Sequence, residues 1–599
     1  MNKQEKLIAG LLGLLLVGWL FFSQQQAAKQ AAVADQTKKT QPVTATAGAS
    51  ASIAAPQAAA THTPVLPESV EPLLEKPVLP EETATLEDGE MQVKVSSHGA
   101  VLTRATLMQF AANPGPKSDK NPPVVLDFAD VPALALAGLP GLPANAAYRM
   151  ERETGKHVVT FTTATQKGLT ITRRIELLKD YQIKVSDTIK NVSSDVVTLA
   201  DNSINVGGLM MGGSANEMLS LDSLPAAADA KTVHWGSEKA TKTFLVGGTP
   251  GGCGGKSSAA GLPEQTAVPI TAPQKWVALK SRFFVAALAS DVPNTGFVMT
   301  AVRDMQKQTY ALKSVAAQIQ YAGQVLAQGQ AVTREYTMFL GPKKLSLLRT
   351  MGNKMDDVME FGFFSWFCKL LLPTLNFFYS LIPNYGVAIL LLTVLVRIIF
   401  WPLTHSSTKS MKKMQEIQPK LKEIQALYKD NPQKMQQETW AIYRDNKVNP
   451  LSSCLPMLVQ IPVFIALFTV LRSAVELRYA PFLWITDLSE PENLFQGMIP
   501  FVGALNILPI LMAATMAIQS YLTPAAGDPQ QQKMMMIMMP IMMLFMFYSF
   551  PAALSLYWTV SQVLSIVQML MMRRTVNHPH KPDVEVIQTR QQRRADARG

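Results

Sequence analysis

The residue with the most unusual chemistry in this chain is Arg397, which lies inside the apolar run LLLTVLVRIIFWPLT (390–404). A charge at the centre of a bilayer costs about 2.5–3.5 kcal/mol even on the mildest insertion scale, so such residues usually serve a function. No Asp or Glu occurs in any of the five apolar segments beyond residue 384. An inward-facing Arg397 must therefore be solvated by water, by uncharged polar side chains, or by a ligand that comes and goes.

Uncharged polar side chains occur where they could surround this arginine. Thr393 precedes it by one helical turn and so shares its face, and Gln460 lies in the apolar run PMLVQIPVFIALF. The last apolar segment adds Tyr557, Trp558, Ser561 and Gln562. Together these residues predict a wet, positively charged cavity that opens to the cytoplasm. The alternative is an Arg397 that faces lipid and extends to the headgroups, because the polar boundary at Thr404-His405 is only about 10 Å away.

The sequence lacks the characteristic residues of several other functional classes. The sequence has no His-Glu zinc motif and no G-x-S-x-G elbow, and Cys253, Cys368 and Cys454 fit neither a metal site nor a disulfide framework. The stretch GGTPGGCGGK (247–256) lacks the Ser or Thr that opens a helix after a phosphate loop, so a flexible loop is expected. Without membrane carboxylates or an internal repeat, a proton pump and a secondary transporter are disfavoured. We expect no catalytic residue, no cofactor and no metal.

The N-terminal part predicts a membrane anchor followed by a tether. Residues 7–22, LIAGLLGLLLVGWLFF, are nearly long enough to span a bilayer. A cleavable signal peptide is the alternative, but the small-residue site Ala32-Val33-Ala34 lies about 12 residues beyond the apolar run. We expect 1–22 to be an uncleaved anchor with a cytoplasmic N-terminus, and 23–83, rich in Ala, Gln, Thr and Pro, to be a disordered tether.

Residues 84–342 predict a β-rich domain. Short runs with period-two alternation, such as HVVTFTTAT from His157 and LTITRRIELL from Leu169, are bounded by turn residues. A β-sandwich is the natural way to bury one face of so many strands. The segment 343–384 is expected to connect this domain to the membrane, and its aromatic part, 361–382, to lie as an amphipathic helix in the outer interface.

The charge distribution predicts the topology of the helical part. We expect spans at 385–404 and, within 455–572, near 455–472, 498–522, 534–550 and 552–572, which with the anchor make six. Lys and Arg outnumber Asp and Glu nine to five in 405–454, and the tail 573–599 is also basic, so both are expected to face the cytoplasm. A seventh span at 361–382 would reverse this orientation. The net charge of +11 thus indicates cytoplasmic loops rather than recognition of a nucleic acid sequence.

The segment 405–454 predicts a helical hairpin. Its first helix has a narrow apolar stripe suited to coiled-coil packing, formed by Met414, Ile417, Leu421, Ile424 and Tyr428, with a kink expected at Pro419. Asn431 can cap the second helix, Pro432 fits its first turn, and Met435 and Ile442 provide a matching stripe. The hairpin is either a docking arm for a ribosome or nascent chain, because its outer faces are basic, or a solvated spacer.

Several stretches resemble one family, the YidC-type membrane protein insertases, over about 385–572. They are TVLVRIIFWPLT with its charged hairpin, KVNPLSSCLPMLVQIPVFIALF, VELRYAPFLWITDLS and DPQQQKMMMIMMPIMMLFMFYSFPAALSLYWTVSQVLSIVQ. The anchor, tether and β-domain resemble the Gram-negative layout of that family. The resemblance implies a periplasmic β-supersandwich, similar to sugar-binding mutarotase folds but without catalytic activity. It also implies contacts with nascent membrane proteins, with the ribosome through hairpin and tail, and with the Sec translocon.

For the site, the resemblance implies that Arg397 is the groove arginine, which transiently meets polar or acidic parts of a substrate while the apolar helix of that substrate moves into lipid. Thr393 and Gln460 match polar groove positions. The last span carries Tyr557-Trp558 where the family usually has two tyrosines. This departure keeps an apolar stacking surface and removes one hydroxyl.

We therefore expect an α-helical polytopic protein of the bacterial inner membrane, with six transmembrane helices, five of them forming an insertase core, and a large all-β periplasmic supersandwich domain. Its expected function is that of a membrane protein insertase and chaperone, alone or with the Sec translocon. Two other classes stay open: a small-anion channel or transporter with Arg397 as selectivity charge, and a purely structural assembly factor. The methionine-rich segment 534–550 either packs against its neighbours or forms a pliable wall for apolar segments.

Overall fold

The computed structural model describes residues 80–115, 121–153, 157–210, 219–235, 265–303, 312–428, 431–446, 448, 455–495, 504–522 and 529–574. The expected anchor, the tether up to residue 79, the glycine-rich loop 247–256 and the tail beyond residue 574 lie outside these residues.

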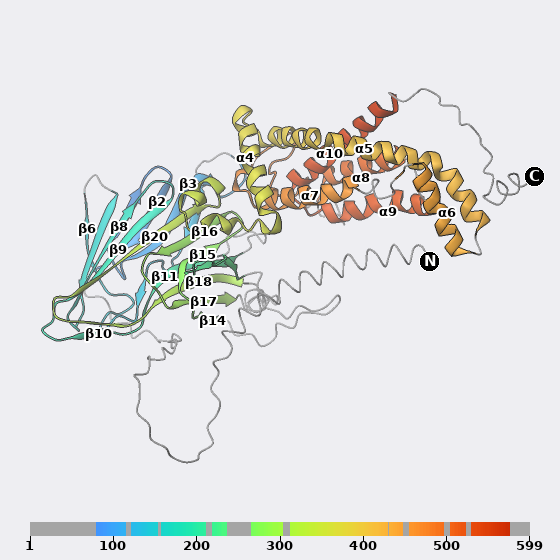
Figure 1. Ribbon diagram of the computed structural model, residues 1–599. Helices are drawn as coiled ribbons and strands as arrows, with labels where there is room; N and C mark the ends of the chain where they lie inside the picture. Colours follow the sequence, from blue (N-terminus) through green and yellow to red (C-terminus); the bar gives the residue numbers. More distant parts are fainter. Residues whose placement is uncertain are drawn as a thin grey trace, which may run out of the picture. The chain divides into compact units, whose positions relative to one another are not determined.

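Before residue 343 the described chain folds into antiparallel sheets (Figure 1). The largest has the strand order β13-β12-β15-β16-β20-β9-β8-β7-β6, a second has the order β14-β17-β18-β11-β5, and two smaller sheets are β1-β2-β3-β4 and β10-β19. The strands are β1 (Thr83–Glu87), β2 (Met91–Ser96), β3 (Val101–Ala111), β4 (Pro123–Asp127), β5 (Leu136–Ala137), β6 (Arg149–Arg152), β7 (Val158–Ala164), β8 (Leu169–Leu177), β9 (Gln182–Asn191), β10 (Val197–Leu199), β11 (Asn202–Met210), β12 (Ser220–Pro225), β13 (Val233–His234), β14 (Gln265–Ile270), β15 (Gln274–Lys280), β16 (Phe284–Ser290), β17 (Gly296–Arg303), β18 (Leu312–Tyr321), β19 (Gln324–Leu326) and β20 (Ala331–Pro342).

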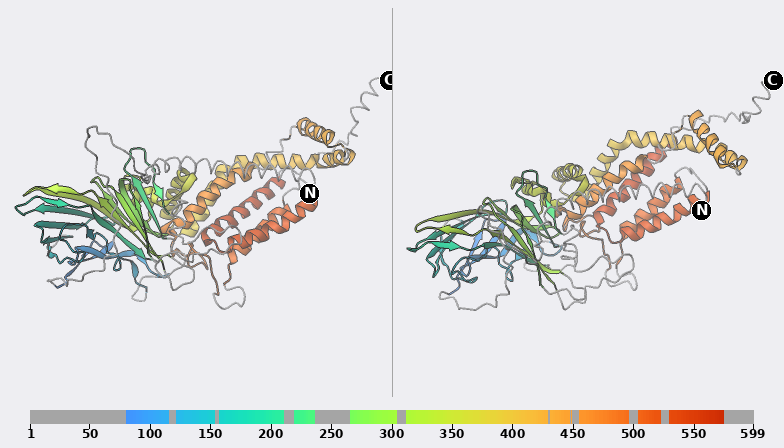
Figure 2. Two further views of the ribbon diagram at one scale, coloured as in Figure 1. Left: turned by 90° about the horizontal axis from the view of Figure 1, so that it is seen from below. Right: turned by 60° about the horizontal axis from the view of Figure 1, so that its bottom comes forward.

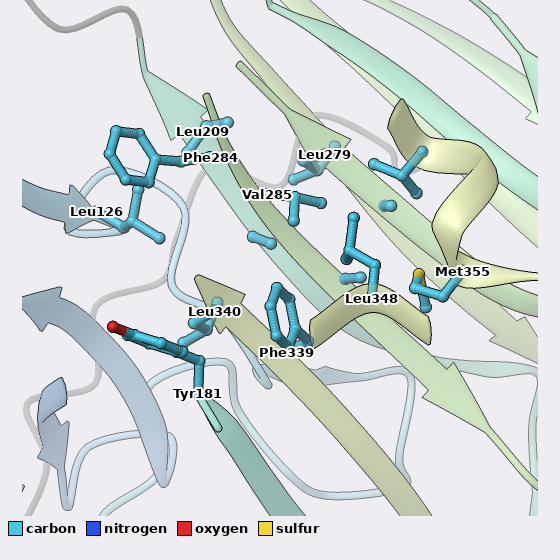
Figure 3. Close-up of a cluster of buried hydrophobic side chains, with 14 of the residues drawn as sticks. Leu126, Tyr181, Leu209, Leu279, Phe284, Val285, Phe339, Leu340, Leu348 and Met355 are labelled. Atoms are coloured by element: carbon cyan, nitrogen blue, oxygen red, sulfur yellow. The ribbon is translucent and has the colours of Figure 1, made fainter. Parts of the chain in front are cut away.

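Period-two alternation explains how these strands form a core. In β8, every second residue from Leu169 to Leu177 is buried, so one face of the strand points into the domain. Strand β11 of the five-stranded sheet contacts β15 and β16 of the nine-stranded sheet. Figure 3 shows the resulting cluster of buried side chains, which come from several sheets and from the short helix that follows β20: Leu126, Leu209, Leu279, Val285, Phe339 and Leu348 are among them. The β-rich domain is therefore held by apolar burial between sheets.

One ion pair is completely enclosed in this domain. Arg173 on β8 and Asp187 on β9 are cross-strand neighbours with fully buried side chains, and two parallel hydrogen bonds of 2.6 Å join them. The remaining nitrogen of Arg173 donates to the carbonyl oxygens of Ala100 and Leu134. Each side-chain nitrogen of Arg173 and each carboxylate oxygen of Asp187 thus has a hydrogen-bond partner. A buried ion pair is tolerated under this condition. Nearby, burial raises the pKa of Tyr148 to about 12, so this phenol stays protonated.

After residue 343 the described chain is helical. The helices are α3 (Leu345–Thr350), η1 (Met355–Met359), η2 (Gly362–Phe364), α4 (Ser365–Leu381), α5 (Tyr385–Leu427), α6 (Pro432–Asp445), α7 (Leu455–Ser473), η4 (Val475–Leu477), α8 (Ile507–Leu522), α9 (Pro529–Phe547) and α10 (Ala552–Arg574). In the part of the chain that the structure describes, two stretches are long and apolar enough to cross a membrane, Tyr385–Ser407 and Ala552–Met571. The shorter apolar helices are Gln460–Ser473, Ile507–Leu522 and Met536–Phe547, and the total of six spans stays a prediction.

Helix α5 differs from the sequence-based expectation. We expected a span ending near residue 404 and a separate hairpin helix, but α5 runs without interruption for 43 residues and passes through Pro402 and Pro419 (Figure 2). The hydroxyl groups of polar residues after the span bond to carbonyl oxygens of the preceding turn and do not cap a helix end. Thr404 donates to the carbonyl oxygen of Phe400 (3.1 Å), and Ser410 donates to that of Ser406 (3.2 Å).

Helix α4 has two apolar faces. Cys368, Leu371, Leu372 and Leu375 are buried against the rest of the chain. The opposite face exposes the large side chains of Trp366, Leu370, Phe377 and Leu381. A soluble surface helix would carry polar residues there, so the placement of α4 in the outer interface stays our prediction for this segment.

The hairpin forms largely along the predicted stripe. Met414 and Ile417 of α5 are buried with Val448, and Leu421, Ile442 and Tyr443 pack against them. The cap predicted at Asn431 is confirmed, since its side-chain oxygen accepts the backbone N–H of Lys434 at 3.1 Å. In Figure 1, α6 folds back beside the second half of α5.

The enclosed ion pair predicts a large stability loss when it is broken. Replacing Asp187→Ala leaves the Arg173 charge buried and unpaired, which we expect to cost about 3–5 kcal/mol. Lys184 and Glu335 form a half-exposed pair on the neighbouring strands β9 and β20, and Glu335→Ala is expected to cost less than about 1 kcal/mol. Urea unfolding of the full chain in detergent, followed by near-UV circular dichroism, measures both. Equal losses for the two variants would contradict the role given to burial.

Candidate functional site in the helical region

The charged centre of the site is Arg397 on α5, held by one residue of α10. Its Nε donates to Ser561 Oγ (3.1 Å), and its Nη2 donates to Ser561 Oγ (2.6 Å) and to the Ser561 carbonyl oxygen (2.7 Å). Arg397 is half-buried and Ser561 is buried. The arginine therefore points toward another helix, where a hydroxyl and a backbone carbonyl solvate its charge.

This contact uses only one side of the guanidinium group. A guanidinium has five N–H donors in a rigid fork, and the contacts with Ser561 engage the N–H groups of Nε and Nη2. Within the described residues, Nη1 has no hydrogen-bond partner and Arg397 has no carboxylate. The side chain is fixed in orientation and still keeps its net positive charge and two donors.

A second polar contact joins α7 to α10. Gln460 Nε2 donates to the hydroxyl oxygen of Tyr557 at 2.7 Å. Tyr557 is 1% exposed and stands one turn before Ser561 on α10. The structure thus brings four sequence-predicted site residues into two contacts, and α10 contributes to both.

Thr393 and Gln562 do not join these contacts. Thr393 is fully buried, and its hydroxyl donates to the carbonyl oxygen of Ile389 in its own helix at 2.7 Å. Thr393 lies one helical turn before Arg397, as the sequence indicates, but its hydroxyl does not solvate the arginine. Gln562 is half-buried, and its amide makes no hydrogen bond to another described residue.

Trp558 lies in an aromatic cluster. Its ring makes an edge contact with Phe464 (5.0 Å between centroids) and a tilted contact with Phe547 (5.4 Å). Its buried Nε1–H finds no hydrogen-bond partner among the described residues. Trp558 therefore serves as an apolar wall next to Tyr557.

One further hydrogen bond between α5 and α10 was not predicted from the sequence. Gln568 Nε2 on α10 donates to Thr404 Oγ1 on α5 at 2.9 Å. Both residues lie seven positions after the partners of the first contact, Ser561 and Arg397, so α5 and α10 run parallel with a polar contact every two turns. We call this line of contacts between α5 and α10 the seam. The equal spacing of polar residues in the two helices is the sequence signal that could have revealed it.

The arrangement is suited to binding rather than to bond breaking. It combines one cation, several uncharged donors and acceptors, and an aromatic wall. Among the described residues, no group of three or more His, Cys, Asp and Glu side chains could hold a metal ion. A positive centre with free N–H donors in apolar surroundings attracts polar and negatively charged groups.

Two family models match the chain. The family described as 60Kd inner membrane protein matches residues 377–580, and the YidC periplasmic domain matches 83–206 and 252–373. Among curated relatives, the membrane protein insertase YidC of Pelobacter propionicus is 41% identical over 304 residues, which cover 51% of this chain and 55% of that protein. The YidC of Syntrophobacter fumaroxidans is 42% identical over 304 residues, covering 50% and 54%. The chain thus matches about half the length of these relatives.

Two solved structures are similar to parts of the chain. An active YidC insertase crystal structure with the first transmembrane domain resolved is 17% identical, with coverage of 83% of this chain and 93% of that chain and a TM-score of 0.33. A putative aldose 1-epimerase from Escherichia coli K12 is 9% identical, with coverage of 44% and 99% and a TM-score of 0.29.

The seam between α5 and α10 predicts a specific crosslink. Thr404→Cys combined with Gln568→Cys, with Cys253 and Cys454 replaced by Ser, is expected to be joined by a short bifunctional thiol reagent such as dibromobimane, because the glutamine side chain spans a gap between the two helices that a cysteine is too short to close directly. The control pairs Thr404→Cys with Val567→Cys, whose side chain is 46% exposed and which lies about 100° around α10 from Gln568. Peptide mass spectrometry measures the yield, and equal yields for both pairs would contradict the parallel seam.

Proposed function

The chain belongs to the YidC family, and we propose on that premise that it is a membrane protein insertase and chaperone. In this proposal it moves short polar segments of a nascent membrane protein past Arg397 and releases their apolar helices into the lipid. The observation that supports it best is the state of Arg397, which is oriented by Ser561 and yet keeps the two N–H donors of Nη1 without a partner among the described residues.

The energetic role of the site follows from this geometry. A polar segment that enters a bilayer loses its water, and each unsatisfied polar group then costs several kcal/mol. Nη1 of Arg397 can donate to carboxylate or carbonyl oxygens of the passing segment, and a hydrogen bond to a charged group contributes about 1.5–3 kcal/mol. Because no carboxylate of the described residues neutralises the positive charge, acidic groups of the passing segment gain the most. In this proposal Gln460, Tyr557, Trp558, Ser561, Thr393 and Gln562 belong to the same groove.

The proposed topology places this groove on the cytoplasmic side. We propose six spans in the inner membrane, with both termini and the hairpin in the cytoplasm and the β-rich domain in the periplasm. This agrees with the excess of Lys and Arg in 405–454. The proposed partners are nascent membrane proteins, the ribosome and the Sec translocon, within the lipid bilayer.

The central prediction concerns the charge of Arg397. Arg397→Ala is expected to slow insertion of a small single-span protein by about ten- to a hundred-fold, because a charge-assisted hydrogen bond of about 1.5–3 kcal/mol is lost. Arg397→Lys keeps the charge and is expected to retain most activity. Protease protection in reconstituted vesicles measures insertion, with Lys184→Ala, which removes an exposed charge from the β-rich domain, as control.

The same vesicles separate this proposal from its rivals. Anion flux without any nascent chain, lost in Arg397→Ala, would identify a channel or transporter instead. Unchanged insertion by Arg397→Ala would contradict the groove role and favour a structural assembly factor.

The hairpin gives a separate prediction about the ribosome. Lys413, Lys420 and Lys422 are exposed on the second half of α5. Their triple replacement by Glu is expected to weaken co-sedimentation with ribosomes, because the surface of ribosomal RNA is negatively charged, and the wild-type binding should fall with salt. Triple replacement by Gln should give an intermediate loss. Binding that is unaffected by the Glu variant would remove the hairpin from the proposed interface.

A further inference from the structure

An exposed apolar turn lies between η4 and α8. Phe482 and Ile485 form two reciprocal backbone hydrogen bonds (2.9 and 2.8 Å), which leave Leu483 and Trp484 at the tip. Leu483 is 75% exposed and Trp484 is 42% exposed, whereas Ile485 is buried. Leu483 also has a left-handed backbone (φ 52°), a conformation that costs a leucine free energy and persists only when its surroundings enforce it. The tip is thus held in an outward-facing conformation.

The turn is attached to the beginnings of two apolar helices. The ring of Phe482 lies directly on Gly386 in the first turn of α5, so closely that a Cβ at this position would come within 2.0 Å of the ring. Trp484 Nε1 donates to Glu492 Oε1 (2.5 Å), and Glu492 Oε2 accepts the backbone N–H of Leu508 at the start of α8 (2.7 Å). These contacts place the tip level with the ends of α5 and α8 that lie away from the hairpin.

The acidic groups of this loop are turned inward or paired. Asp487 is buried and accepts the N–H groups of Tyr479 and Ser489 and the hydroxyl of Ser489. Glu492 is buried as described above, and Glu490 pairs with Arg282. The tip therefore presents a leucine and an indole without a free charge beside them. Tryptophan with a satisfied N–H at the end of a membrane helix is the side chain that prefers the headgroup region of a bilayer.

We propose that Leu483 and Trp484 insert into the headgroup region of the leaflet opposite the hairpin, so that this turn is a lipid anchor. The ligand is a phospholipid surface. A protein partner would fit the apolar side chains equally well, but the attachment of the tip to the ends of α5 and α8 favours lipid. The inference rests on the membrane placement of α5 in the proposed function and not on insertase activity.

The test uses the full chain in vesicles of phosphatidylcholine and phosphatidylglycerol. Leu483→Cys is labelled with the environment-sensitive fluorophore NBD, with Cys253 and Cys454 replaced by Ser, while Cys368 is buried. We expect strong loss of emission when the vesicles contain headgroup-nitroxide lipid and little loss with aqueous iodide. The matched control is Val325→Cys on β19, an exposed apolar residue (61%) that should show the reverse.

Two results would overturn the proposal. Quenching at position 483 by iodide alone would place the tip in water. Shielding from both quenchers would show that protein, either another segment or a second copy, covers it. The measurement is repeated with Arg397→Ala, which should leave the quenching at 483 unchanged even where insertion is lost, so that failure of the anchor and failure of the insertase proposal are distinguished.

Discussion

The contact between Arg397 and Ser561 imposes the main constraint on the helical region, because it solvates a charge in apolar surroundings without neutralising it. A carboxylate partner would stabilise the arginine more strongly, but the pair would then have no net charge and little remaining attraction for another group. A hydroxyl and a carbonyl oxygen supply only dipoles. The positive charge of the guanidinium stays available, and its orientation is fixed at the same time.

The other contacts of α10 keep this arrangement in register. A serine can reach the arginine only if α5 and α10 are aligned along their length, and the bond between Thr404 and Gln568 aligns them two turns further on. The bond between Gln460 and Tyr557 ties α10 to α7 one turn before Ser561. The rings of Phe464 and Phe547 surround Trp558 and limit its movement. Helix α10 is therefore the element on which the geometry of the site depends.

The sequence predicted features that depend on local spacing. The alternation in LTITRRIEL predicted the strand β8, and Asn431-Pro432 specified where α6 begins. The resemblance to the YidC family, stated from short motifs, is confirmed by the family matches. Helical spacing also placed Thr393 on the face of Arg397, but spacing cannot tell whether a hydroxyl bonds to its own helix or to a neighbour.

Features that depend on distant residues could not be predicted in this way. The partner of Arg397 is 164 positions away, and Thr404 and Gln568 are separated by the same distance. The enclosure of Arg173 and Asp187 depends on neighbouring strands and on distant carbonyl groups such as that of Ala100, which local spacing does not reveal. The continuity of α5 past Ser410 also escaped prediction, because serine and threonine are common at helix ends and only their actual hydrogen bonds show that they continue the helix.

That continuity makes α5 a direct connection between the charged centre and the hairpin. Arg397 and Leu427 belong to one helix, and the 30 residues between them correspond to about 45 Å at 1.5 Å per residue. Because Thr404 is bonded to Gln568 on α10, a tilt of α5 that keeps both contacts can begin only beyond Thr404. Pro402 and Pro419 each remove a backbone hydrogen bond from this stretch, so we expect movements of the hairpin to be taken up by bending at these prolines before they reach the arginine.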